Sequence, residues 1–453
     1  MGIKKNILIL FLTLGQIVTG QTYDSLLTNL ISVETEALGD SDTLFDPCVL
    51  KTLSKDQSIR LWALALPFNM VLDTGAIDTA SYELGKSLSR SSLFAAPIKR
   101  KWSIKNEMAT KFYSGFRSAV DSMNKLGENI QLILVDHNEK NNSYRIQDDP
   151  FNSIYEYSAE GFMDICNRFC VEKIIGPFRS EASQILAKKS TKIPVINPVS
   201  RAVNVKDNPM LIAAAPSRKS ESCALGKRAA MDRENNDSSI TVLLLTPNSV
   251  KMKLDSSFLE SYVSMGRRAI EVVVLELSDE IDFNELVSRG PNDMLIRYVL
   301  LDNNVLTAAQ LLSAFRIRNP ELTEFWSMGS VLKSNALDSY LLLRQPIVWA
   351  QAERADYIKR NLIYNSIQRF SKISPGRWEW LGYDMAWYAG YMKNNTPMAY
   401  AGPRRLYVWS HNEGHGYVNE SALMFRFDHA GVRPLDLVEP FKLPQETDSL
   451  IIN

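Results

Sequence analysis

The stretch IIGPFRS, residues 174–180, carries the pattern that decides the fold. Its apolar run stops abruptly at Gly176-Pro177, and Ser180 follows three residues later. Short apolar runs bounded by Gly and Pro are typical of strands buried on both faces. Two interpretations of the serine are open: a ligand site at the carboxyl end of a parallel sheet, or an ordinary strand-to-helix turn. On this stretch alone the ordinary turn is favoured.

The same pattern recurs on both sides of this stretch, with helices between the strands. In the helix predicted over 108–127, apolar residues fall at spacings of three and four, and Gly127 supplies a C-cap. A second helix is predicted over 154–170. The strands lack alternation, which predicts parallel sheets covered by helices on both faces. They are too many for one convenient sheet, so we predict two βαβ domains, with strands at 60–68, 131–136, 171–177, 193–198, 210–216, 239–247, 269–277 and 297–304.

Length and charge set broad limits on the class of protein. A chain of 453 residues is too long for one compact core and predicts two or three domains. Its 51 basic and 51 acidic residues balance. This balance gives no electrostatic case for a nucleic-acid partner or for an anionic membrane surface.

The N-terminus has the pattern of a cleaved secretory signal. Lys4 and Lys5 precede an apolar run from Ile7 to Val18, and small residues follow. The run is shorter than the roughly 20 residues that a membrane helix needs, and no later stretch is long and apolar enough. We therefore predict a signal peptide over 1–20 and an exported, periplasmic protein with no membrane span.

The four cysteines, Cys48, Cys166, Cys170 and Cys223, are compatible with an oxidising compartment. Cys166 and Cys170 lie four residues apart on one face of a predicted helix, where regular backbone geometry makes a disulfide between them awkward. A metal site on this pair would need two further ligands that the sequence does not visibly supply. We expect either reduced, partly buried thiols or one long-range bridge.

Several stretches, taken in order, resemble type I periplasmic-binding-protein-like proteins. They are LALPFN, FYSGFRSAVDSMNKLG, LVDHN, IIGPFRSEAS, IPVINPVS, LIAAAPS and LGYDMAWYAG, and the resemblance runs from about 58 to 437. Their order and spacing carry it, since no single stretch is specific. The chain is most similar to Bacteroidetes envelope proteins related to LysM-associated proteins and to amino-acid ABC-transporter substrate-binding proteins. The resemblance implies a protein without catalytic activity or a cofactor.

The fold implied by this resemblance has two doubly wound, Rossmann-like lobes joined by three crossovers, with a ligand between them. The first lobe is expected over 58–215 and 329–400, and the second over 216–328 and 401–440. An N-terminal extension over 21–57 and a C-terminal tail over 441–453 are expected outside the lobes. Ligand binding beyond the carboxyl ends of the strands agrees with the general behaviour of open α/β sheets.

The resemblance also implies ligand-binding residues. In amino-acid-binding relatives, the loops that match GPFRS and NPVS offer hydroxyls and N–H groups to a ligand carboxylate, and a helix N-terminus there favours an anion. In the first lobe this implies Ser180, Ser183 and Ser200. In the second lobe the strand ends imply Asn248, Asp302 and Asn303, with Asp302 as the acid for a ligand ammonium. Two alternatives stay open: Ser180 as a helix N-cap, and Asp302-Asn303 as the start of a turn.

Two further stretches bear on function. The insertion over 70–104 follows the first strand and carries apolar residues such as Leu72 and Phe94, so we expect part of it to pack over the mouth of the inter-lobe cleft. This insertion weakens any transfer of amino-acid binding from transport proteins. The stretch HNEGH, 411–415, places two histidines four apart, but its glycines indicate a loop and disfavour a metal site.

Two functions from different classes therefore compete. The first is an envelope binding protein that closes two lobes around a small, amino-acid-like solute. The second is a solute-free docking subunit of an envelope protein complex, associated with the outer membrane or with peptidoglycan. The insertion, the extension and the lack of a cysteine near the predicted cleavage point favour docking, whereas the usual role of the family favours a solute.

Overall fold

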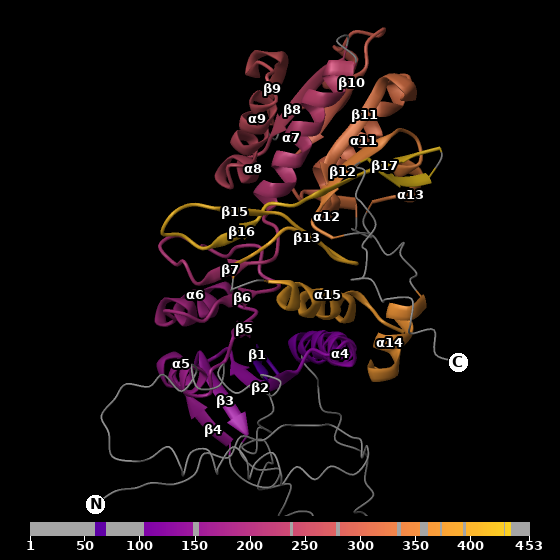
Figure 1. Cartoon of the computed structure of the whole chain (residues 1–453). Coiled ribbons are helices and arrows are strands. Elements are labelled where there is room, and N and C mark those ends of the chain that lie inside the picture. Colours follow the sequence, from indigo (N-terminus) through magenta and orange to yellow (C-terminus); the bar gives the residue numbers. More distant parts are fainter. Residues whose placement is uncertain are drawn as a thin grey trace, which may run out of the picture.

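The computed structural model describes residues 59–68, 104–147, 154–235, 239–277, 281–332, 337–353, 361–371, 374–392, 396–429 and 431–435. They form two α/β lobes, one on a nine-stranded sheet and one on a seven-stranded sheet (Figure 1). A two-stranded sheet pairs β13 (Tyr400–Ala401) with β14 (Leu406–Tyr407). The predicted signal peptide, extension and tail lie outside the described residues, as does the predicted insertion except for its last residue.

The sheet of the first lobe has the order β15-β16-β7-β6-β5-β1-β2-β3-β4. Its core strands β7, β6, β5, β1 and β2 are all parallel. Numbered along the chain, they follow the doubly wound order 2-1-3-4-5. The bounds are β1 (Arg60–Leu66), β2 (Ile130–Asn138), β3 (Ser143–Gln147), β4 (Ile154–Tyr157), β5 (Lys173–Ile175), β6 (Val195–Asn197), β7 (Leu211–Ala213), β15 (Trp409–His411) and β16 (Tyr417–Asn419).

Helices cover both faces of this sheet. One face packs on α4 (Ile104–Lys125), α14 (Asn361–Ser371) and α15 (Arg377–Tyr391), and the other on α5 (Ala159–Arg168) and α6 (Ser180–Lys189). The backbones of α4 and α15 approach closely because glycines face each other: a Cβ on Gly382 would lie 1.9 Å from the carbonyl oxygen of Phe112. This packing joins segments that are far apart in the sequence.

The sheet of the second lobe has the order β18-β17-β12-β11-β10-β8-β9, with β17 and β18 antiparallel and the other five strands parallel. The parallel strands again follow the order 2-1-3-4-5. Strand bounds are β8 (Ile240–Leu245), β9 (Val272–Glu276), β10 (Ile296–Leu300), β11 (Thr323–Met328), β12 (Ile347–Gln351), β17 (Leu423–Asp428) and β18 (Gly431–Pro434). The helices include α7 (Arg218–Asn235), α8 (Pro247–Lys251), α9 (Leu254–Ser264), α10 (Phe283–Ser288), α11 (Val305–Ala314), α12 (Gly329–Leu332) and α13 (Ser339–Leu342).

Three crossovers join the lobes, and two of them differ from the predicted division. The first leads from β7 to α7 and the third from β16 to β17. We predicted 329–400 in the first lobe, but β12 pairs with β11 and β17, so the second crossover follows Gln351 instead of Gly329. We assigned 401–440 to the second lobe, but β15 and β16 extend the first sheet because β16 pairs with β7.

Two local predictions are also tested. The segment 154–170 was predicted to be one helix, but its first four residues form β4, which pairs with β3, and α5 begins only after the N-cap Ser158. Cys166 is a buried free thiol and Cys223 is free, so Cys166 and Cys170 do not form a bridge with each other. Cys170 is disulfide-bonded.

The carboxyl edges of the two parallel sheets face each other's lobe. The carboxyl end of β7 leads directly into the first crossover, and the carboxyl end of β12 leads into the second. Because the core strands of each sheet run in the same direction, the carboxyl ends of their neighbours lie on the same side. In each lobe, the loops that follow the parallel strands therefore lie on the side of the sheet from which the crossovers leave.

Candidate functional site

All the predicted ligand residues except Ser200, which follows β6, lie at topological switch points, where ligands bind in open α/β sheets. In the first lobe, the switch point lies between β1 and β5, and the loop of residues 176–179 leaves β5 there. In the second lobe, it lies between β8 and β10, which precede Asn248 and Asp302 respectively. Strand order could not be read from the sequence, so this coincidence is new information from the structure.

In the first lobe, Asn197 ties the two predicted ligand loops together. Its side-chain Nδ2 donates to the carbonyl oxygen of Pro177 at 2.8 Å and to the Ser183 hydroxyl at 2.6 Å. Its Oδ1 accepts from the backbone N–H groups of Val199 and Ser200 at 3.1 and 2.8 Å. We did not predict this residue, although a polar residue that ends a buried apolar strand was a usable signal.

The three predicted serines differ in their environment. Ser183 is fully buried, and its hydroxyl is engaged with Arg179 O at 2.7 Å and with Asn197, so it holds the loop in place. Ser180 is half-buried, and its hydroxyl makes no hydrogen bond to a described residue. The N-cap of α6 is Arg179 and not Ser180, so the alternative of a capping serine is wrong. Ser200 is also half-buried, and its Oγ accepts only a long bond of 3.4 Å from Ala202 N.

In the second lobe, Asp302 organises the predicted residues around itself. The carboxylate is buried and accepts from the Thr246 hydroxyl at 2.9 Å, from Asn248 Nδ2 at 2.7 Å and from Asn303 N at 2.6 Å. These three bonds use most of its acceptor capacity, so a ligand ammonium would find little of the carboxylate available. Thr246 also caps α8, which was not predicted.

The remaining two residues of this set are more accessible. Asn248 is exposed on α8, and the Asn303 amide contacts the Ser330 hydroxyl and the Arg218 guanidinium at the start of α7. The structure thus brings Asn248, Asp302 and Asn303 into one group, and Ser183 and Ser200 into another through Asn197. Within the described residues, no hydrogen bond links the two groups directly.

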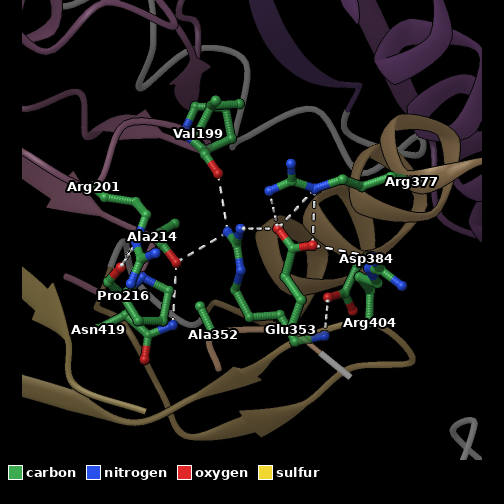
Figure 2. Close-up of polar contacts among 12 residues, drawn as sticks. Val199, Arg201, Ala214, Pro216, Ala352, Glu353, Arg377, Asp384, Arg404 and Asn419 are labelled. Carbon is green, nitrogen blue, oxygen red and sulfur yellow. Dashed lines mark hydrogen bonds and ion pairs between the residues drawn. The ribbon is translucent and has the colours of Figure 1, made fainter. Parts of the chain in front are cut away.

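A second polar cluster, which the sequence did not reveal, ties the lobes at the crossovers (Figure 2). Glu353, two residues beyond β12, accepts from Arg377 at the start of α15, with Nη2 at 2.7 Å from Oε1 and Nε at 2.9 Å from Oε2. Arg404 and Arg405, in the turn between β13 and β14, add contacts at 3.0 and 3.4 Å. Three arginines thus surround one buried carboxylate, and we call these four residues the hinge cluster.

The hinge cluster reaches all three crossovers. Arg405 Nη1 donates to the carbonyl oxygens of Pro198 and Ala214, and the second of these lies on the first crossover. Asn419, which precedes the third crossover, donates to the same Ala214 oxygen at 3.1 Å. Burial disfavours ionisation of Glu353, but the hydrogen bond from Arg377 and the charges of the three arginines outweigh it and hold its pKa far below the usual range.

A second ion pair joins the lobes beside the hinge cluster. Arg201 follows Ser200 in the first lobe, and its guanidinium lies 2.7 Å from the buried carboxylate of Glu221 on α7 of the second lobe. Glu221 also accepts from Ala352 N on the second crossover at 3.0 Å. The loop that carries Ser200 is therefore attached to both lobes.

The two histidines of the HNEGH stretch differ in their contacts. In the HNEGH stretch, His411 ends β15, and His415 Nδ1 accepts from Asp207 N at 3.0 Å, so the two histidines have different settings. No group of three metal-ligating side chains gathers among the residues that the structure describes. Within the same residues, no helix has the length and apolar character to cross a bilayer.

Comparison with solved structures defines the class of the fold. A putative branched-chain amino acid ABC transporter from Rhodospirillum rubrum is 14% identical, with a TM-score of 0.52 over 83% of this chain and all of that chain. Haemophilus influenzae LpoA is 12% identical, with a TM-score of 0.50 over 91% of this chain and 66% of that chain. The C-domain of LpoA, described as a regulator of PBP1A, is 11% identical, with a TM-score of 0.47.

These structures confirm the predicted fold class, two doubly wound α/β lobes of the type I periplasmic-binding-protein-like kind. No known protein family and no curated protein matches the sequence. At such low identity the likeness shows the fold alone, so function has to be argued from the residues of this chain.

Proposed function

We propose that this chain is a non-catalytic, exported binding protein of the cell envelope that holds a small solute between its two lobes. The observation that carries the proposal is the position of the β5 loop (176–179) and of Asn248, Asp302 and Asn303 at the two switch points, at the carboxyl ends of the strands from which the crossovers leave. An origin in the Bacteroidetes, a relation to LysM-associated proteins, a cleaved signal peptide and a periplasmic location are part of the same proposal.

The residues available to the solute are those whose polar atoms are not used inside the lobes. In the first lobe these are the hydroxyl of Ser180, in the first turn of α6 where an anion is favoured, and the hydroxyl of Ser200 after β6. In the second lobe only the Oδ1 of Asn248 remains, because its Nδ2 donates to Asp302 and the Asn303 amide is engaged with Ser330 and Arg218. Because Asp302 is held by three internal hydrogen bonds, the solute we propose carries a carboxylate or another anion and does not depend on an ammonium group.

The experiment combines native mass spectrometry with thermal denaturation. Purified protein should carry a small anionic molecule, or should be stabilised by one from a panel of carboxylates. A ligand at a hundredfold excess over its Kd contributes about 2.7 kcal/mol. Ser180→Ala combined with Ser200→Ala should remove this stabilisation while ligand-free melting stays within a few degrees. The matched control is Ser122→Ala, since Ser122 lies in the same lobe and bonds only Ser118 O within α4.

A docking subunit is the second candidate, and the inter-lobe ion pairs favour it. Closure around a solute rotates the lobes about the crossovers, where Glu353 and Arg201 bind groups of the other lobe. Breaking a buried ion pair is costly, so these contacts favour one fixed orientation. If native mass spectrometry shows no solute, and no carboxylate raises the melting temperature, the solute proposal fails and a protein partner becomes the better explanation.

A further inference from the structure

The ion pairs at the crossovers join different parts of the molecule. In the hinge cluster, Glu353 lies on the second crossover, and its three arginines come from α15 and from the turn between β13 and β14. Both of these segments pack in the first lobe, where Tyr388 of α15 stacks on Tyr407 of β14 in one core. The hinge cluster therefore attaches a crossover to the first lobe.

The pair between Arg201 and Glu221 instead connects the two lobes directly. Arg201 lies in the loop that follows β6 of the first lobe. Glu221 lies in the first turn of α7, a helix that packs against β11, β12 and β17 of the second lobe. Arg201 Nη2 is 2.7 Å from a carboxylate oxygen of Glu221. Because each lobe supplies one member of the pair, a rotation of one lobe against the other separates the two charges.

Both members of the pair are also bonded to a crossover. Arg201 Nε donates to Pro216 O on the first crossover at 3.0 Å (Figure 2). Glu221 accepts from Ala352 N on the second crossover at 3.0 Å. The Glu221 side chain is only 3% exposed, whereas 34% of the Arg201 side chain is accessible. Separation of the pair would take the Arg201 charge away from a buried carboxylate, which is the costly way to break an ion pair.

We propose that the Arg201–Glu221 pair is a latch between the lobes, which holds them in one orientation and opens when they rotate. Ser200 immediately precedes Arg201, and Asn197 of the first lobe accepts from its backbone N–H at 2.8 Å. A molecule that displaces the Ser200 loop therefore also acts on the latch, so this loop and the lobe orientation are coupled. Only that coupling rests on the proposed function, because the latch itself requires no solute.

The test measures the lobe orientation by single-molecule fluorescence energy transfer in the full mature chain, with no solute added. Dyes are attached through ketone-bearing residues in place of Lys188 and Val250, which are exposed on α6 of the first lobe and on α8 of the second. This attachment leaves the native cysteines unlabelled. Wild type should give one narrow distribution of transfer efficiency. In Arg201→Gln, molecules outside this distribution should become about tenfold more frequent.

Two further variants show whether the pair acts as a unit. Glu221→Gln keeps an acceptor for Ala352 N and removes the charge, so it should give the same distribution as Arg201→Gln. The double variant should change the distribution no further, since both substitutions open one pair. The matched control is Arg228→Gln, because Arg228 pairs with Asp232 at 2.8 Å within α7. Loss of a pair inside one lobe should leave the lobe orientation unchanged.

Three results would overturn the proposal. The first is a wild type with several lobe orientations, since the lobes would then rotate with the pair present. The second is an unchanged distribution in both Arg201→Gln and Glu221→Gln. The third is an equal change in Arg228→Gln, which would indicate a general loss of stability. Circular dichroism of each variant checks that it is folded. None of these results depends on the search for a solute by native mass spectrometry, so the latch and the proposed function can fail separately.

Discussion

Removal of the negative charge from the hinge cluster should destabilise the whole molecule. In Glu353→Gln the shape of the side chain is kept, but Arg404 and Arg405 lose their counter-charge while only 9% and 3% of their side chains are exposed. Breaking a buried ion pair from one side costs about 3–5 kcal/mol. With about 2–4 °C per kcal/mol for a domain of this size, the melting temperature should fall by roughly 6–20 °C.

The assay is differential scanning calorimetry at pH 7, with Arg377→Gln as the matched control. The Arg377 side chain is 54% exposed, so its loss should cost only about 1 kcal/mol. The pKa of Glu353 is depressed in the folded protein, so its stabilisation is complete above the unfolded carboxyl pKa of about 4.3 and is lost as the pH falls below it. The difference in melting temperature between wild type and Glu353→Gln should therefore become smaller as the pH falls below about 4.3. A variant that melts within 2 °C of wild type at pH 7 would refute this account.

Two further predictions concern the first lobe. Asn197→Ala should lower stability by about 1–3 kcal/mol, since it leaves buried loop groups unpaired, and urea unfolding with Ser122→Ala as control would show this. Lys173 is buried, and its ammonium donates to Ala389 O at 2.6 Å. Burial, and after it the charge of Arg60, lower the pKa of Lys173 from 10.5 to about 8. Between pH 8 and 10.5 unfolding therefore takes up a proton. The free energy of unfolding of wild type, relative to that of Lys173→Met, should rise by up to about 3 kcal/mol over this pH range. A difference between the two proteins that does not change with pH would contradict this.

Much of the fold could be predicted because its strands are buried on both faces. Continuous apolar runs such as 131–136 leave few alternatives to a parallel α/β sheet. The start of α5 was missed because the alternation of Ile154–Tyr157 is too short to distinguish a strand from a helical turn. The second crossover was misplaced because β11 and β12 were not among the predicted strands, and the sheet to which a strand belongs depends on pairing that local sequence does not show.

The candidate site was predictable only in part, for a related reason. Strand ends could be located, so residues that follow them, such as Ser200 and Asn248, could be selected as candidates, but local sequence does not say which polar atoms the fold uses internally. Asp302 and Ser183 were selected as ligand residues although their side chains bond within their own lobes. The hinge cluster is assembled from Glu353 and three arginines on separate segments, so no motif or residue spacing in the sequence predicts it.

The packing of α4 against α15 has a consequence for how the chain acquires its structure. Phe112 and Phe116 of α4 belong to the core that α15 closes, yet residues 126–376 are synthesised between the two helices. Contacts between such distant segments form slowly, because a large loop must first be closed. The α4 face thus stays uncovered until the chain is nearly complete, whereas most of the second lobe can fold as one contiguous segment. Early intermediates should therefore aggregate through the first lobe, and a chaperone that protects this chain would act on α4.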